Sequence, residues 1–116
     1  GTANKEARDV LGTLHNPHVA LFATAGVPPQ MAHAKESLIN AANCLPDGVE
    51  PVGTFICQGK VDPKVIEMMY KMFPKGHSHG QSADRDARHK QAAVHPNEDD
   101  FKAAQEFAKD ILIKLS

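Results

Sequence analysis

Two stretches of small and polar residues, each placed directly after a hydrophobic run, are the parts of this sequence best suited to contact a ligand. Thr24-Ala25-Gly26 ends the run of residues 18–24, and Gln58-Gly59 ends the run of residues 51–57. Each stretch leads into a helical pattern, so each is predicted to be a strand-to-helix loop. Ligands of open α/β sheets bind outside the carboxyl ends of the strands. The sequence therefore predicts a binding edge here, with an ordinary turn as the alternative for each loop.

Histidines and cysteines offer weaker candidates for chemistry. The histidines of one polar segment lie near one another in the sequence: His77, His79, His89 and His95. Structural zinc sites usually combine four ligands that include thiolates, and neither cysteine is near, so a solvated loop is favoured and no metal is predicted. Cys57 is predicted to be a buried small hydrophobic residue rather than a redox thiol. His95-Pro96-Asn97, which acidic residues follow, indicates a helix start.

The bulk properties limit the class of protein. The chain has 116 residues, the size of one small domain, and its 13 basic and 14 acidic residues nearly cancel. This balance leaves no electrostatic footprint for nucleic acid, and no apolar run reaches the ~20 residues of a membrane span. No secretory leader is visible at Gly1. Two cysteines suit a reducing, cytoplasmic location better than a disulfide scaffold.

Helices and strands alternate along the predicted order. The expected elements are a helix over 4–15, a strand over 18–24, a helix after Pro28-Pro29, a strand over 51–57, a helix over 62–73, a polar segment over 74–96, and a final helix capped by Asn97. The two strands lack alternation and are therefore expected to be parallel, adjacent and buried on both faces. Two strands are too few for a stable sheet. Either a second copy or strands upstream of Gly1 would complete it.

The helices have apolar positions that predict their buried faces. In the helix over 62–73 and in the final helix these positions are Val65, Ile66, Met69, Met72, Phe73 and Phe101, Ala104, Ala108, Ile111, Leu115. Residues 75–95 have few apolar anchors and are expected to be the least ordered part of the chain, with at most residues 84–93 helical.

Four segments carry a resemblance to a known family. "GTANKEARDVL", "VALFATAG", "GTFICQGKVDPKVIEMMYKMFP" and "HPNEDDFKAAQEFAKDI" resemble a flavodoxin-like family of anaerobic bacteria, which includes proteins associated with bilirubin reductase. The resemblance implies a flavodoxin-like, doubly wound parallel sheet in three α/β/α layers. Members of the family open with a Ser/Thr-Gly-Asn-Thr loop that grips the FMN phosphate. This sequence lacks that loop, so residues 1–116 are expected to be the C-terminal portion of such a domain, without its first three strands.

The resemblance also implies a function. FMN would be the cofactor, and the activity would be electron transfer to or from a partner reductase, for which a bilirubin reductase is the candidate. The loops flanking the flavin ring would contain Gly1, Thr2, Thr24, Ala25, Gly26, Gln58 and Gly59. Alternatives are an FMN-dependent oxidoreductase with its own small substrate and an inactive fragment. Without the phosphate loop, these 116 residues alone are expected to bind FMN weakly.

Overall fold

The computed structural model describes residues 2–77 and 80–116. Gly1 and His79, both considered above, lie outside the described residues. The elements are α1 (Lys5–Leu11), β1 (Val19–Ala25), α2 (Ala32–Ala42), β2 (Pro51–Gln58), α3 (Pro63–Met72), α4 (Ala83–Ala92) and α5 (Glu98–Lys114). The predicted order is confirmed. The first helix ends at Leu11, four residues before its expected end, and a helix does form within the polar segment.

Local capping explains where α1 and α3 begin. The Asn4 side chain accepts a hydrogen bond from the Ala7 N–H at the start of α1. Asp62 accepts from the Lys64 N–H at 2.9 Å, and Pro63 occupies the first turn of α3. These contacts satisfy backbone donors that have no partner within the helix.

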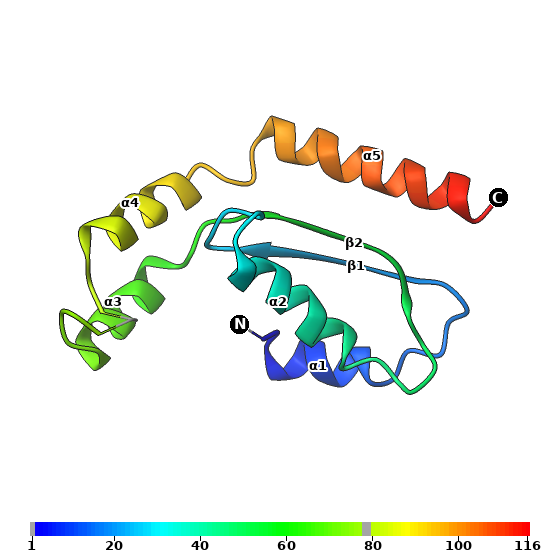
Figure 1. The fold of residues 1–116 in the computed structure, drawn as a ribbon, viewed down its shortest axis with the longest axis horizontal. Helices are drawn as coiled ribbons and strands as arrows, with labels where there is room; N and C mark the ends of the chain where they lie inside the picture. The colour runs from blue at the N-terminus through cyan, green and yellow to red at the C-terminus, as the bar shows by residue number, and fades with distance from the viewer. Residues whose placement is uncertain (1, 78–79) are drawn as a thin grey trace.

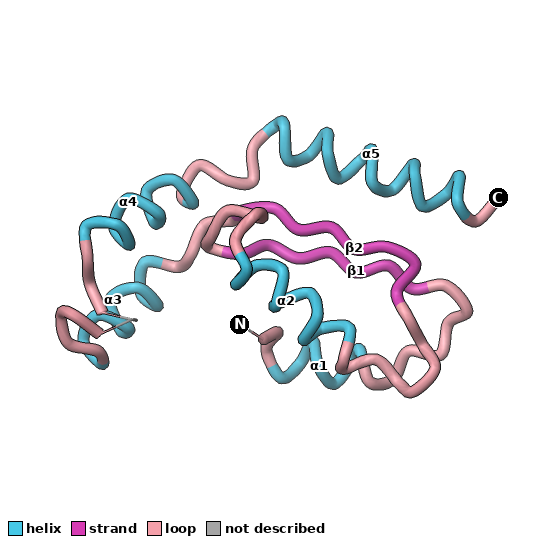
Figure 2. Tube along the Cα trace, in the orientation of Figure 1, coloured by secondary structure: helices cyan, strands magenta, loops and turns pink. Residues whose placement is uncertain are grey.

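The two strands are parallel and adjacent, as predicted (Figure 2). Their register pairs Leu21 with Thr54 and Ala25 with Gln58. Because both strands run in the same direction and end at paired residues, the loops that follow them leave the sheet at the same edge. This carboxyl edge is where the sequence predicts ligand binding.

Helices cover both faces of the sheet, which confirms the three-layer arrangement (Figure 1). On one face, Val19, Leu21 and Leu45 form the buried core, against which side chains of α1 and α2 pack. On the other face α5 lies along β2, where the Phe55 and Phe107 rings stack with centroids 5.7 Å apart. Helices α3 and α4 project past the carboxyl ends of the strands.

The expectation that the first strand is buried on both faces is wrong. Phe22 is 81% exposed. It pairs in register with Phe55, so it points to the face that α5 covers. Helix α5 packs on β2, however, and leaves this face of β1 open to solvent. An apolar run predicts a strand that helices cover on both faces, but β1 has only one described neighbouring strand and no described helix over this face.

The predicted buried faces of two helices are also partly wrong. Val65 and Met72 of α3 are 46% and 67% exposed, because α3 projects beyond the carboxyl ends of the strands and does not lie on the sheet. Phe101 and Leu115, near the two ends of α5, are 50% and 40% exposed. Ile111 remains in the α5–β2 contact, beside Gly53.

That residues 75–95 are the least ordered part of the chain stays a prediction. Slow amide hydrogen exchange throughout these residues would contradict it.

His89 of α4 is a shielded titratable residue that faces Tyr70 of α3. The two rings lie edge to face with centroids 6.0 Å apart. Both ring nitrogens of His89 are buried, and neither has a hydrogen-bond partner within the described part of the chain. Burial is the main cause that lowers the pKa of His89; the Asp86 charge raises it, and the Arg85 and Arg88 charges lower it.

We therefore expect the protein to lose stability as the pH falls below about 6.5, the usual pKa of an unfolded-chain histidine. The pKa of His89 is lower in the folded protein than in the unfolded chain, so the unfolded chain takes up the proton first as the pH falls. The stability that neutral His89 contributes is therefore fully present only above the pKa of the unfolded chain. Denaturant unfolding at pH 7.5 and at pH 5.5 should show a smaller loss of stability for His89→Phe than for the wild type. His15→Phe, at an exposed position, is the control. Equal losses in all three proteins would contradict a buried, neutral His89.

Candidate functional site

The two predicted loops meet at the carboxyl edge of the sheet. The Gln58 side chain donates from Nε2 to the Gly26 carbonyl at 3.2 Å, and the Gly59 N–H donates to the Ala25 carbonyl at 2.8 Å. Gln58 is 3% exposed, so its amide holds the loops together and does not point freely into solvent. Of the predicted residues, Ala25, Gly26, Gln58 and Gly59 thus form one hydrogen-bonded unit, and Thr24 packs against Gly59.

Glycine is required in both loops because the loops lie so close to each other. A Cβ at Gly26 would lie 2.5 Å from Cγ2 of Val61, and a Cβ at Gly59 would lie 2.8 Å from Cβ of Thr24. These separations are shorter than side-chain carbons tolerate. The glycines therefore allow the two loops to pack closely. Thr24 is exposed at this edge.

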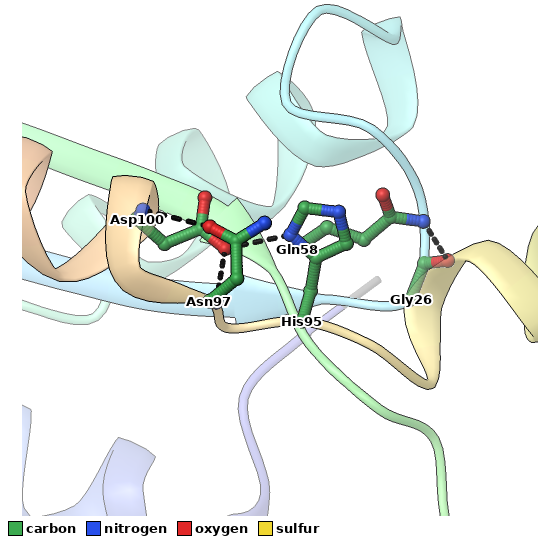
Figure 3. A network of polar contacts seen from close by, with 5 residues as sticks. All are labelled: Gly26, Gln58, His95, Asn97 and Asp100. Atoms are coloured by element: carbon green, nitrogen blue, oxygen red, sulfur yellow. Dashed lines mark hydrogen bonds and ion pairs between the residues drawn. The ribbon is translucent and has the colours of Figure 1, made fainter.

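A third segment, the connection between α4 and α5, joins this edge. The Lys60 N–H donates to the His95 carbonyl at 3.1 Å. Nδ1 of His95 lies 2.6 Å from Oδ2 of Asp100, and the same oxygen accepts from the Asn97 N–H at 2.8 Å. The Asn97 side chain in turn accepts from the Asp100 N–H at 3.1 Å, completing a capping box at the start of α5 (Figure 3).

This network sets the charge states at the edge. The hydrogen bond from His95, followed by that from the Asn97 backbone, lowers the pKa of Asp100. Asp100 is therefore a carboxylate at neutral pH. Burial, and to a smaller extent the Asp100 charge, raises the pKa of the Cys57 thiol. Cys57 is 7% exposed, and it packs as the small hydrophobic residue that the sequence predicts.

Sequence reasoning identified the helix start at Asn97 but missed the contact between His95 and Asp100. The spacing of a capping box, with an acidic residue three positions after the cap, was the available signal. It predicts the Asn97–Asp100 pair and says nothing about a side chain two residues before the cap. The Asp100 carboxylate contacts both the Asn97 N–H and the His95 ring, because the segment between α4 and α5 brings His95 close to the start of α5.

The remaining predicted residues contribute less. Thr2 is exposed at the described start of the chain, and no hydrogen bond joins it to the two loops within residues 2–77 and 80–116. Within these ranges no three His, Cys, Asp or Glu side chains are close enough together to hold a metal ion. No described helix has the length and hydrophobicity of a membrane span.

Two surface depressions lie away from the carboxyl edge. The larger, of about 530 Å³, is lined by residues 42–43 and 45–51 at the amino end of β2. The other lies between α2 and β2 and is lined by Lys35, Leu38, Ile39, Ala42 and Thr54. Both are wide open to solvent, and neither contains a residue of the two loops. The candidate site is therefore an edge of joined loops, distinct from these depressions.

A parallel sheet between helices, with strand-to-helix loops at its carboxyl edge, is the arrangement of a doubly wound α/β protein. The family model described as "Flavodoxin domain" matches residues 1–109. Two curated relatives are flavodoxin-like domain-containing proteins called BilS. That of Clostridioides difficile is 31% identical over 120 residues, covering 100% of this chain and 66% of the relative. That of Clostridium symbiosum is 33% identical over 92 residues, covering 78% of this chain and 48% of the relative.

The chain belongs to the flavodoxin-like family that includes these BilS proteins. The family's flavodoxin domain indicates a flavin-binding redox function. The chain spans between about half and two thirds of the length of the curated relatives it matches.

The loops at the carboxyl edge fit the ring of FMN better than its phosphate. Thr24, Ala25 and Gly26 are at least partly exposed there and have no charged side chain, which suits a flat, uncharged ring. A phosphate dianion needs clustered N–H groups and hydroxyls at a helix N-terminus. The Ser/Thr-Gly-Asn-Thr sequence that would supply them does not occur in residues 1–116. The residues present therefore fit the ring and not the phosphate.

Proposed function

We propose that this chain is the ring-binding portion of an FMN-dependent electron-transfer protein. The observation that carries the proposal is the hydrogen-bonded junction of the loops after β1 and β2, through Gln58 and the Gly26 carbonyl. It forms one edge at the carboxyl ends of two parallel strands in a chain of flavodoxin type. Bound FMN would supply the redox chemistry, and the protein would supply position and electrostatics.

In this proposal the chain's own residues orient the ring. Backbone groups of Thr24, Ala25, Gly26 and Gly59 contact it, and Thr2 and Gly1 are the further candidates by family resemblance. Gln58 acts indirectly, because its amide is committed to Gly26. Residues 1–116 would be the C-terminal portion of the domain.

The partner would be a redox protein, and a bilirubin reductase is the candidate that the family resemblance suggests. A reducing cytoplasm is the proposed location, since Cys44 and Cys57 are both free thiols. Flavodoxins are often acidic, whereas this chain has a formal net charge of −1. Electrostatic steering of the partner is therefore expected to be weak.

Absorbance spectroscopy tests the proposed cofactor directly. The protein as its gene encodes it, with any residues that precede Gly1, should purify with the yellow absorbance of FMN or acquire it from added FMN. The bound flavin should bleach under anaerobic reduction and recover on oxidation. A protein that stays colourless after incubation with excess FMN would contradict the proposal and favour an inactive fragment. Turnover of a small substrate without any partner would favour the independent oxidoreductase.

A further inference from the structure

His95 lies at the junction of the loops that the proposed function assigns to the flavin ring. Its carbonyl accepts from Lys60, the residue that follows Gly59. Figure 3 draws His95 together with Gln58, whose side chain reaches from β2 to the Gly26 carbonyl. The His95 and Asp100 side chains are 21% and 19% exposed, so the pair is shielded but can still be reached from outside.

One nitrogen of the imidazole is committed to the protein. At 2.6 Å, Nδ1 and the Asp100 carboxylate must share a proton, and Asp100 is ionised because two hydrogen bonds lower its pKa. The proton therefore belongs to Nδ1, and Nε2 is the atom left for another contact. Nε2 accepts a hydrogen bond in the neutral ring and donates one in the imidazolium.

Capping alone does not require this histidine. The capping box at the start of α5 is complete with Asn97 and Asp100, and a cap needs no imidazole on the same carboxylate. The added contact instead fixes the tautomer and orientation of the His95 ring, as carboxylates do for histidines whose other ring nitrogen binds a metal ion.

We propose that His95 contacts the bound cofactor through Nε2, as the hydrogen-bonding partner of a carbonyl or ring nitrogen at the polar edge of the flavin. Asp100 is its positioning residue, which holds the tautomer and the ring orientation. This inference rests on the proposed FMN-binding function and adds one ligand-contacting residue to it.

Nitrogen-15 NMR of the histidine side chains, on the protein as its gene encodes it, tests the contact. Without FMN, His95 should show a strongly downfield, slowly exchanging Nδ1–H, which Asp100→Asn should remove. Added FMN should shift the Nε2 resonance of His95 and leave that of the exposed His15 unchanged. The shift that FMN produces in the wild type depends neither on activity nor on a variant that must fold.

FMN affinity measured by fluorescence quenching supplies the second test. His95→Phe loses one hydrogen bond to the flavin and should therefore weaken binding by up to about tenfold. His95→Gln, which keeps a side-chain N–H, should retain most of the affinity, and His15→Gln should retain all of it. If the wild type binds FMN with an unchanged Nε2 resonance and His95→Phe binds equally well, the role of His95 is overturned alone. If the wild type binds no FMN, the proposed function and this role are both overturned.

Discussion

Replacing Gly53 with valine should lower the free energy of unfolding by about 3 kcal/mol, the upper range for overpacking a filled interior. Gly53 lies where α5 packs on β2. A Cβ there would lie 2.6 Å from Cδ1 of Ile111 and 3.1 Å from Cε2 of Phe107. Phe107 has little room to move, because its ring stacks on Phe55. Valine adds two further methyl groups to this contact, so the Ile111 and Phe107 side chains must be displaced from the strand.

Urea unfolding followed by circular dichroism measures this loss. Gly12→Ala is the control, because a Cβ at Gly12 would meet only ordinary contacts of 3.6 Å or more. It should change the stability by less than about 0.5 kcal/mol or raise it slightly. Adding Ile111→Ala to Gly53→Val should recover part of the loss, since the two positions share one contact. A Gly53→Val protein as stable as the wild type would contradict the packing of α5 on β2.

Residues 1–116 alone should bind FMN at least 100-fold more weakly than the protein that its gene encodes with any residues upstream of Gly1. The ring loops offer neutral backbone contacts, whereas a phosphate site offers charge-assisted hydrogen bonds of roughly 1.5–3 kcal/mol each. Losing two such bonds is enough for a factor of about 100, since each 1.4 kcal/mol is tenfold.

Fluorescence quenching by both forms of the protein gives the two values of Kd. Riboflavin, which lacks the phosphate, is the matched ligand control: its affinity should differ little between the two forms. Equal FMN affinities would show that no phosphate loop upstream contributes. A large difference for riboflavin as well would mean that the ring loops of residues 1–116 do not hold their shape alone.

Local signals explain how much of this structure could be predicted from the sequence. Asp62-Pro63 and Asn97 fix helix starts through contacts within a few residues, and both predictions are confirmed. The apolar runs fix the two strands, and the helix between them requires a crossover that makes them parallel. These features depend on short stretches of chain.

Contacts between distant segments could not be predicted in the same way. The exposure of Phe22 depends on which strand α5 covers, and the pattern of its own strand carries no information on that. The bond between Gln58 and Gly26 joins residues 32 positions apart, and a loop glycine gives no sign of its partner. The His95–Asp100 contact needs the turn between two helices, which the capping pattern does not specify.

The central claim is that the loops after β1 and β2 contact the flavin ring. Backbone amide NMR of the labelled protein, as its gene encodes it, tests this claim most directly when FMN is titrated in. We predict the largest shifts at the amides of Thr24, Ala25, Gly26 and Gly59, with little change across residues 42–51 at the opposite end of the sheet. Shifts confined to residues 42–51, or none in either loop when FMN is bound, would contradict the account.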